Sequence, residues 1–222
     1  MSSESTLRHG HGSGFDLIET MRWEPAGGFL RGDLHLARLE ASARALGFGF
    51  DREIVGQNLK RAATGDAALR VRLALAADGS TDVTTQPFAA LAPDAMWTIR
   101  IAATRLDSSN LLLRHKTTRR EAYDRARAEF SREKADEMIL LNQAGNVCEG
   151  TITSIFVDLG EGGPLGTPAL ACGLLAGVLR GEMLERGEAV ETILSLDDLG
   201  GASRLWVGNS LRGLIPAKLV RG

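Results

Sequence analysis

The sequence is poor in several features, and each shortage argues against a class of protein. Two cysteines in 222 residues, Cys148 and Cys172, are too few for a disulfide framework, so we expect reduced thiols. No apolar run approaches the roughly 18 residues that a membrane span requires. A net charge of -2 gives no general attraction to nucleic acid or to anionic membranes. We therefore expect a cytoplasmic protein that binds neither nucleic acid nor membranes.

Lysine is also scarce, and one of the four lysines has an unusual context. The 26 basic residues include only Lys60, Lys116, Lys134 and Lys218. Lys116 follows three leucines and the pair Arg114-His115, in "LLLRHK". Desolvation and nearby positive charge both lower the pKa of a lysine, and carbonyl chemistry requires a neutral amine. A lysine at a helix entry, with its stem packed on apolar side chains, is the alternative.

Several familiar motifs are missing or incomplete. "HGHG" at residues 9–12 supplies only two histidines, so we predict no metal site. "GEGGPLG" lacks the Lys-Ser/Thr of a phosphate loop and is typical of a turn. Neither Gly-x-Ser-x-Gly nor His-Glu-x-x-His occurs. His35 lies on a predicted helix, where a packed or surface histidine is the ordinary interpretation.

The first half of the chain predicts an α+β lobe. We expect a flexible leader over residues 1–14 and an N-terminal lobe over residues 15–108. Its predicted elements are a strand over 15–23, a helix capped by Asp33 and ended by Gly47, a helix over 51–63, a hairpin turning near Asp78-Gly79, and a strand over 96–104.

The second half, residues 109–222, predicts another mixed lobe. Its expected elements are a charged helix over 119–133, strands over 136–142 and 147–159, an amphipathic helix over 173–187, and short strands over 189–195 and 204–210 around a capped turn. Two such lobes give an α/β (α+β) fold, and small-molecule sites often lie between lobes.

Three features of the second half suggest one cofactor. Lys116 supplies an amine, and Glu149 follows a tight turn that can direct its carboxylate between the lobes. The glycine-rich start of "GLLAGVLRG" can present free backbone N–H groups to a phosphate. An amine, a partner for a ring nitrogen and an anion site together are what pyridoxal 5'-phosphate (PLP) requires.

Four longer stretches carry a family resemblance. "HKTTRREAYDRA", "DEMILLNQAGNVCEGTITSIFV", "TPALACGLLAGVLRGEMLERG" and "NSLRGLIPA" resemble, in that order, the fold-type IV PLP enzymes (aminotransferase class IV, D-amino acid aminotransferase-like). The aminodeoxychorismate lyases are the most similar branch. The resemblance covers about residues 15–219. It implies two lobes with the cofactor between them, a homodimer, and a protein that works alone or beside aminodeoxychorismate synthase.

The resemblance also implies roles for individual residues. Lys116 would hold the cofactor covalently and then move protons, and Glu149 would keep the ring nitrogen protonated. The residues that it assigns to the cofactor's phosphate are Arg38, Val178, Leu179 and Ser210.

The sequence departs from the family pattern at three positions. Ser154 stands where Asn is common, Ala176 where Pro is common, and Leu179 where some aminotransferases have Thr. The Leu179 departure removes one side-chain contact to phosphate but leaves the backbone amides. Tyr123 lies seven residues after Lys116, farther than the ring-contacting tyrosine of branched-chain aminotransferases, so we expect it only to pack on a helix.

The expected activity follows from the resemblance. It implies a lyase that converts 4-amino-4-deoxychorismate to 4-aminobenzoate and pyruvate in folate biosynthesis. Arg114 and Arg212 are candidates to bind the substrate's two carboxylates, with surface salt bridges as the alternative. A class IV aminotransferase acting on branched-chain or D-amino acids is a second interpretation, and a non-catalytic protein of the same fold is a third.

Overall fold

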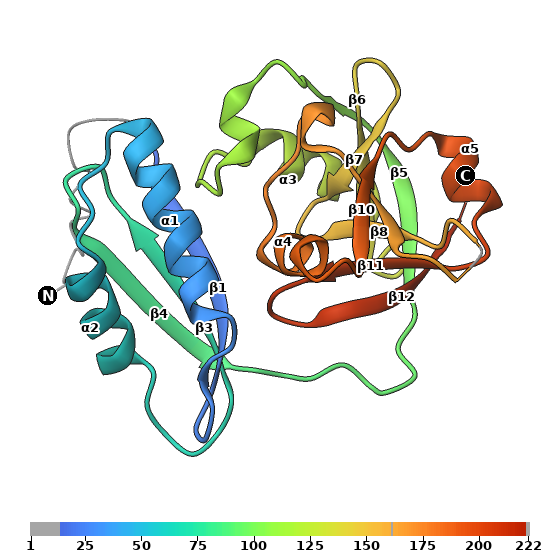
Figure 1. Ribbon diagram of the computed structural model, residues 1–222. Coiled ribbons are helices and arrows are strands. Elements are labelled where there is room, and N and C mark those ends of the chain that lie inside the picture. Colours follow the sequence, from blue (N-terminus) through green and yellow to red (C-terminus); the bar gives the residue numbers. More distant parts are fainter. Residues whose placement is uncertain (1–13, 161, 221–222) are drawn as a thin grey trace, which may run out of the picture.

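The computed structural model describes residues 14–160 and 162–220, and it contains two lobes built around two separate sheets (Figure 1). The leader and the "HGHG" motif fall almost entirely on residues 1–13, outside the described residues. Of the described helices, none is long and apolar enough to cross a membrane.

The small lobe is a four-stranded antiparallel sheet with two helices packed against it. Its strands, in spatial order, are β2 (Gly28–Phe29), β1 (Leu17–Glu24), β3 (Leu69–Leu75) and β4 (Thr81–Pro87). Its helices are α1 (Gly32–Leu46) and α2 (Arg52–Ala62). Leucines and valines of both helices and of β1 and β3 form one core, as the helical and alternating patterns predicted.

Local capping explains where these helices begin and end. The Asp51 carboxylate accepts from the amides of Glu53 and Ile54 and so starts α2. Gly47 ends α1 in the left-handed conformation, at φ 73°. The predicted cap at Asp33 is wrong: Arg31 occupies the N-cap position, and the exposed Asp33 pairs with Arg52 at 3.2 Å.

The large lobe is a mixed eight-stranded sheet. In spatial order its strands are β10 (Ala189–Thr192), β9 (Leu165–Pro168), β8 (Ser154–Val157), β11 (Leu205–Asn209), β12 (Gly213–Leu219), β5 (Trp97–Leu106), β6 (Glu137–Asn142) and β7 (Val147–Gly150). Its helices are α3 (Glu121–Ala128), α4 (Val178–Glu185) and α5 (Leu196–Gly201), with 3-10 helices at Leu111–Arg114 and Leu170–Cys172.

The change of sheet comes earlier in the chain than the expected division near residue 108. β5 pairs in parallel with β6 and β12, so it belongs to the large sheet. The chain therefore passes from one sheet to the other between Pro87 and Trp97, along the extended connection that runs from the lower end of β4 beneath the large lobe in Figure 1.

Two elements are shorter than predicted because carboxylate side chains accept hydrogen bonds from their backbone amides. The strand expected over 147–159 breaks after Gly150, since the buried Glu137 carboxylate accepts from the amides of Thr151 and Ile152. The helix expected over 173–187 starts only at Val178. Gly173 has a φ of 88°, and the Leu175 amide donates to Glu149 instead of to a helical carbonyl.

The charged helix expected over 119–133 is also shorter, spanning only Glu121–Ala128. Arg120 has a non-helical φ of -123° at the start. Beyond the end, the Glu129 carboxylate accepts from the amides of Ala103 and Thr104 on β5. These bonds direct the chain onto the sheet instead of into further helical turns.

Candidate active site

The main cavity of the described residues, about 730 Å³ in volume, is lined by side chains of both lobes. The small lobe contributes residues of β1, α1 and β3, and the large lobe contributes most of the remaining wall. The cavity-lining residues that the sequence singled out are Arg38, Lys116, Glu149, Val178, Leu179, Ser210 and Arg212. Arg114 is exposed and is not among the lining residues.

Lys116 is held at the cavity by its backbone. Its carbonyl oxygen accepts from the Ile18 amide at 2.8 Å, and Thr117 forms an isolated antiparallel bridge with Leu17. Burial, followed by the charge of Arg38, lowers the pKa of Lys116 to about 8. A low pKa was the expectation from sequence, but Arg38 supplies the nearby charge where Arg114 and His115 were expected to do so.

Glu149 also lines the cavity and is only 5% exposed. It alternates on β7 with Cys148, which packs into the core behind the cavity. Its Oε1 atom accepts from the Tyr123 hydroxyl at 2.7 Å and from the Leu175 amide at 3.0 Å. Burial raises the pKa of Glu149 to about 7, although both hydrogen bonds act to lower it.

The start of α4 also faces the cavity. Gly177 is its N-cap residue and provides no side-chain cap for the first helical amides. A Cβ at Gly177 would lie 2.7 Å from the Ser154 hydroxyl, so glycine is the residue that fits there. Val178 and Leu179, the first two helical residues, line the cavity. Uncapped amides at a helix start favour a bound anion.

A buried polar network in the small lobe supports the wall beside α4. The Arg38 guanidinium donates to both oxygens of Glu19, at 2.8 and 2.6 Å, and to the Ala176 carbonyl at 3.1 Å. His35 joins Glu19 to Ser210: its Nδ1 lies 2.6 Å from Glu19 Oε2 and its Nε2 lies 2.7 Å from Ser210 Oγ. This network crosses from one lobe to the other and fixes Arg38 and Ser210 at the cavity.

Two arginines from different lobes come together elsewhere on the cavity wall. Arg70, on β3, donates to the Gln86 side chain at 3.0 Å, and Arg212, after β11, donates to the Ala89 carbonyl at 3.0 Å. Burial and the charge of Arg70 lower the pKa of Arg212. Neither arginine forms an ion pair with a carboxylate of residues 14–160 or 162–220.

Sequence reasoning did not single out Glu19 or Arg70. It expected His35 to be a packed or surface histidine and Tyr123 only to pack, without the contacts that they make here. A signal for Glu19 was present, because it alternates with Leu17 and Met21 on the inward face of β1. A charged residue at such a position requires a buried partner. Tyr123 had no comparable signal, since Glu149 lies 26 residues further along the chain.

The chain matches the model of one protein family, described as amino-transferase class IV, over residues 16–220. A curated relative from Schizosaccharomyces pombe, named "Putative aminodeoxychorismate lyase", is 31% identical over 194 residues. That alignment covers 84% of this chain and 82% of the relative.

Solved structures of similar fold carry two kinds of name. A "Putative amino-acid aminotransferase" from Mesorhizobium loti is 55% identical with a TM-score of 0.91, covering 93% of this chain and 100% of the other. The 4-amino-4-deoxychorismate lyase of Pseudomonas aeruginosa is 26% identical with a TM-score of 0.76, covering 92% and 82%. These likenesses confirm the expected two-lobed fold.

Proposed function

The chain belongs to the amino-transferase class IV family, and on that premise we propose that it is a PLP-dependent lyase converting 4-amino-4-deoxychorismate to 4-aminobenzoate and pyruvate. The placement of Lys116, Glu149 and the start of α4 around one cavity is the main support for this function. The lyase reaction in particular is supported by the similarity to the S. pombe relative.

The residues present fit the cofactor's three functional groups. Lys116 offers an amine of lowered pKa to the aldehyde. Glu149 has one oxygen, Oε2, without a hydrogen-bond donor among the described residues, which suits a protonated ring nitrogen. The uncapped amides of Val178 and Leu179 suit the phosphate, with Arg38 and Ser210 beside them.

The chemistry divides between the cofactor and the protein. When bound, PLP supplies an electron sink for the carbon that carries the substrate amine. The Lys116 amine would take the proton from that carbon and return a proton to the departing three-carbon product. Glu149, as a carboxylate, would keep the ring nitrogen protonated.

The substrate's carboxylates would bind at Arg70 and Arg212. A guanidinium pairs with a carboxylate through two parallel hydrogen bonds. Two guanidinium groups that lack carboxylate partners in the described chain repel each other, and an anion between them relieves that repulsion. Arg212 was a candidate from sequence, whereas Arg114 lies away from the cavity wall and is replaced in this role by Arg70.

One experiment separates this function from its main rival. The PLP-loaded protein is incubated with 4-amino-4-deoxychorismate and, separately, with amino acids plus 2-oxoglutarate. Formation of 4-aminobenzoate and pyruvate is the expected result. Amino transfer without 4-aminobenzoate would contradict the lyase proposal.

An amino-acid aminotransferase is the second candidate, because the 55%-identical M. loti structure carries that name. The same residues would serve it: Lys116 would move the proton, and Arg70 and Arg212 would bind the acid groups of the amino acid and the oxo acid. The incubation described above distinguishes the two, since only the lyase releases an aromatic amine.

A further inference from the structure

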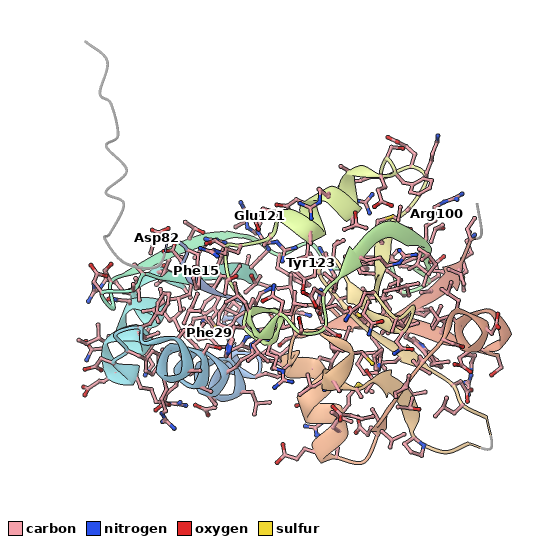
Figure 2. The ribbon with its side chains drawn as sticks, turned by 90° about the horizontal axis from the view of Figure 1, so that it is seen from above. Phe15, Phe29, Asp82, Arg100, Glu121 and Tyr123 are labelled. Atoms are coloured by element: carbon pink, nitrogen blue, oxygen red, sulfur yellow. The ribbon has the colours of Figure 1, made fainter. Side chains whose placement is uncertain are left out.

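Tyr123, the only tyrosine of the chain, lines the cavity and contacts Glu149. It is the third residue of α3, and its ring packs on the core cluster that contains Leu140 and Cys148. Figure 2 shows Tyr123 near the middle of the molecule, between Asp82 on the small lobe and Arg100 on the far side of the large lobe.

The Tyr123 ring is held from a second side by Arg120. The guanidinium carbon lies 5.0 Å from the ring centroid, and the same side chain donates to the Thr151 carbonyl at 2.7 Å. With its ring fixed in this way, the tyrosine has little freedom to direct its hydroxyl elsewhere. The 2.7 Å hydrogen bond from the Tyr123 hydroxyl to Glu149 Oε1 is therefore held in one geometry.

The two oxygens of Glu149 are not equivalent. Oε1 accepts two hydrogen bonds, one from Tyr123 on α3 and one from the Leu175 amide in the segment before α4. Oε2 accepts none from the described residues, and Glu149 lines the cavity. Both donors thus orient the carboxylate so that a single oxygen is available to a ligand.

We propose that Tyr123 is a positioning residue, which holds Oε1 of Glu149 so that Oε2 meets the ring nitrogen of the cofactor. This role rests on the proposed use of PLP. The hydroxyl donates to Glu149, so it also favours the ionised carboxylate over the neutral acid. A neutral Glu149 could not keep a ring nitrogen protonated, so both effects serve the same end.

The charged groups around Glu149 show how this hydrogen bond affects the pKa of the carboxyl group. The titratable and charged groups that act on Glu149 or its partner are Lys116, Arg120, Tyr123 and Cys148. Burial raises the pKa of Glu149 to about 7, and the Tyr123 hydrogen bond is the first influence opposing that rise. Loss of the hydroxyl should therefore move the pKa of Glu149 further upward.

The test is Tyr123→Phe in the full chain, with two readouts. Carbon NMR of the glutamate-labelled protein without cofactor follows the ionisation of Glu149, whose signal is identified by its absence in Glu149→Gln. We expect the pKa of Glu149 to rise by about one unit, the effect of one lost hydrogen bond. Fluorescence titration with PLP at neutral pH should show about tenfold weaker binding.

Thr151→Val is the matched control, because it removes a buried hydroxyl of the same wall that donates to Glu137 instead of to Glu149. It should leave the pKa of Glu149 unchanged. If Tyr123→Phe does not fold, the reverse measurement decides. The Raman tyrosine doublet, which reports the hydrogen bond of the hydroxyl, belongs to Tyr123 alone, and it should differ between wild type and Glu149→Gln when the carboxylate acceptor is replaced.

An unchanged Glu149 pKa together with unchanged PLP affinity in Tyr123→Phe would show that the tyrosine only packs, and would overturn its positioning role alone. A wild-type chain that takes up no PLP would instead overturn the proposed function. The two failures are therefore distinguishable.

Discussion

Each lobe holds a buried carboxylate whose pKa is shifted, and the two pKa values are shifted in opposite directions. Glu19 of the small lobe is 1% exposed, and Glu149 of the large lobe is 5% exposed. Burial raises the pKa of both, but Arg38 and His35 outweigh it at Glu19, whose pKa is lowered to about 2. Glu149 has only neutral donors, and its pKa is raised to about 7.

This difference distinguishes a carboxylate that is fully paired within the fold from one that can still bind a ligand. Glu19 has both oxygens occupied by partners within the protein. Glu149 keeps one oxygen open, and it lacks a cation in hydrogen-bond contact. A buried carboxylate that has no cationic hydrogen-bond partner is suited to bind a ring nitrogen that carries a proton.

Lys116 lies in the field of both carboxylates, so removing it should have the largest effect. Lys116→Ala should reduce turnover by about 10,000-fold or more, since in the proposed function the amine both attaches the cofactor and carries the proton. The exposed Lys134→Ala is the control and should behave as wild type. Borohydride reduction with PLP, followed by peptide mass analysis, should label Lys116. A label on another lysine would refute the assignment.

Neutralising each carboxylate in turn should separate stability from activity. Glu19→Gln should lower the free energy of unfolding by about 3 kcal/mol or more, because Arg38 and His35 lose their buried counter-charge. Glu24→Gln, on the same strand but at the surface, should change it by less than about 0.5 kcal/mol. Urea denaturation of the cofactor-free proteins measures both. Equal stability of the two variants would refute the structural role of Glu19.

Glu149→Gln should have the converse effect. The amide retains an acceptor for Tyr123 and Leu175 but cannot pair with a protonated ring nitrogen. We expect turnover to fall by about 100-fold while the cofactor-free protein remains at least as stable as wild type at neutral pH. Steady-state kinetics and urea denaturation on the same preparation give both values. A large loss of stability with normal turnover would assign Glu149 to the fold.

The same comparison predicts opposite responses to pH. The pKa of Glu19 is depressed on folding, so its stabilising effect is present above about pH 4.5 and lost as the pH falls toward about 2. The pKa of Glu149 is raised, so its contribution is favourable below about pH 4.5 and is lost as the pH rises through about 7.

Cofactor-free wild type should therefore lose about 3 kcal/mol of unfolding free energy relative to Glu149→Gln between about pH 4.5 and about pH 8. The difference between wild type and Glu19→Gln should stay nearly flat over that interval. Urea denaturation across the pH series measures both differences. Parallel curves for the two variants would contradict the assigned charge states.

A smaller effect is expected at Arg70 and Arg212, the pair proposed to bind the substrate's carboxylates. Arg70→Gln and Arg212→Gln should each raise KM by roughly 10- to 100-fold, the cost of losing a charged hydrogen bond, with little change in kcat. Arg72→Gln, on the same strand but absent from the cavity lining, is the matched control. A KM that stays at the wild-type value in both cavity variants would remove the pair from substrate binding.

Much of this arrangement could be predicted from periodic and local signals. The helices of the small lobe, the hairpin at Asp78-Gly79 and the capped turn at Ser195 are fixed by residues close in sequence, and each was confirmed. Local sequence and the family resemblance pointed to Lys116 and Glu149, and both residues line the cavity.

The features that could not be predicted from the sequence depend on contacts between residues that lie far apart along the chain. β12 was not among the expected strands, and it contains Pro216, a residue that sheets rarely accept. β5 pairs with β12 only from Ala217 onward, so Pro216 removes no hydrogen bond from that neighbour. The Tyr123–Glu149 contact likewise exists only because α3 packs beside β5 and β6.

The smallest predicted effect concerns a third carboxylate, Asp51, which accepts two hydrogen bonds as Glu149 Oε1 does, but at the surface. Asp51→Ala should cost about 1 kcal/mol of unfolding free energy, because water can replace part of what the α2 cap loses, and Asp51→Asn should cost less. Turnover and PLP affinity should be unchanged in both, since Asp51 lies outside the cavity wall. Urea denaturation and PLP titration give these values. A change in PLP affinity would show that the small-lobe helices influence the cavity by a route other than the Glu19 network. Asp51 would then have to be counted among the carboxylates that affect ligand binding.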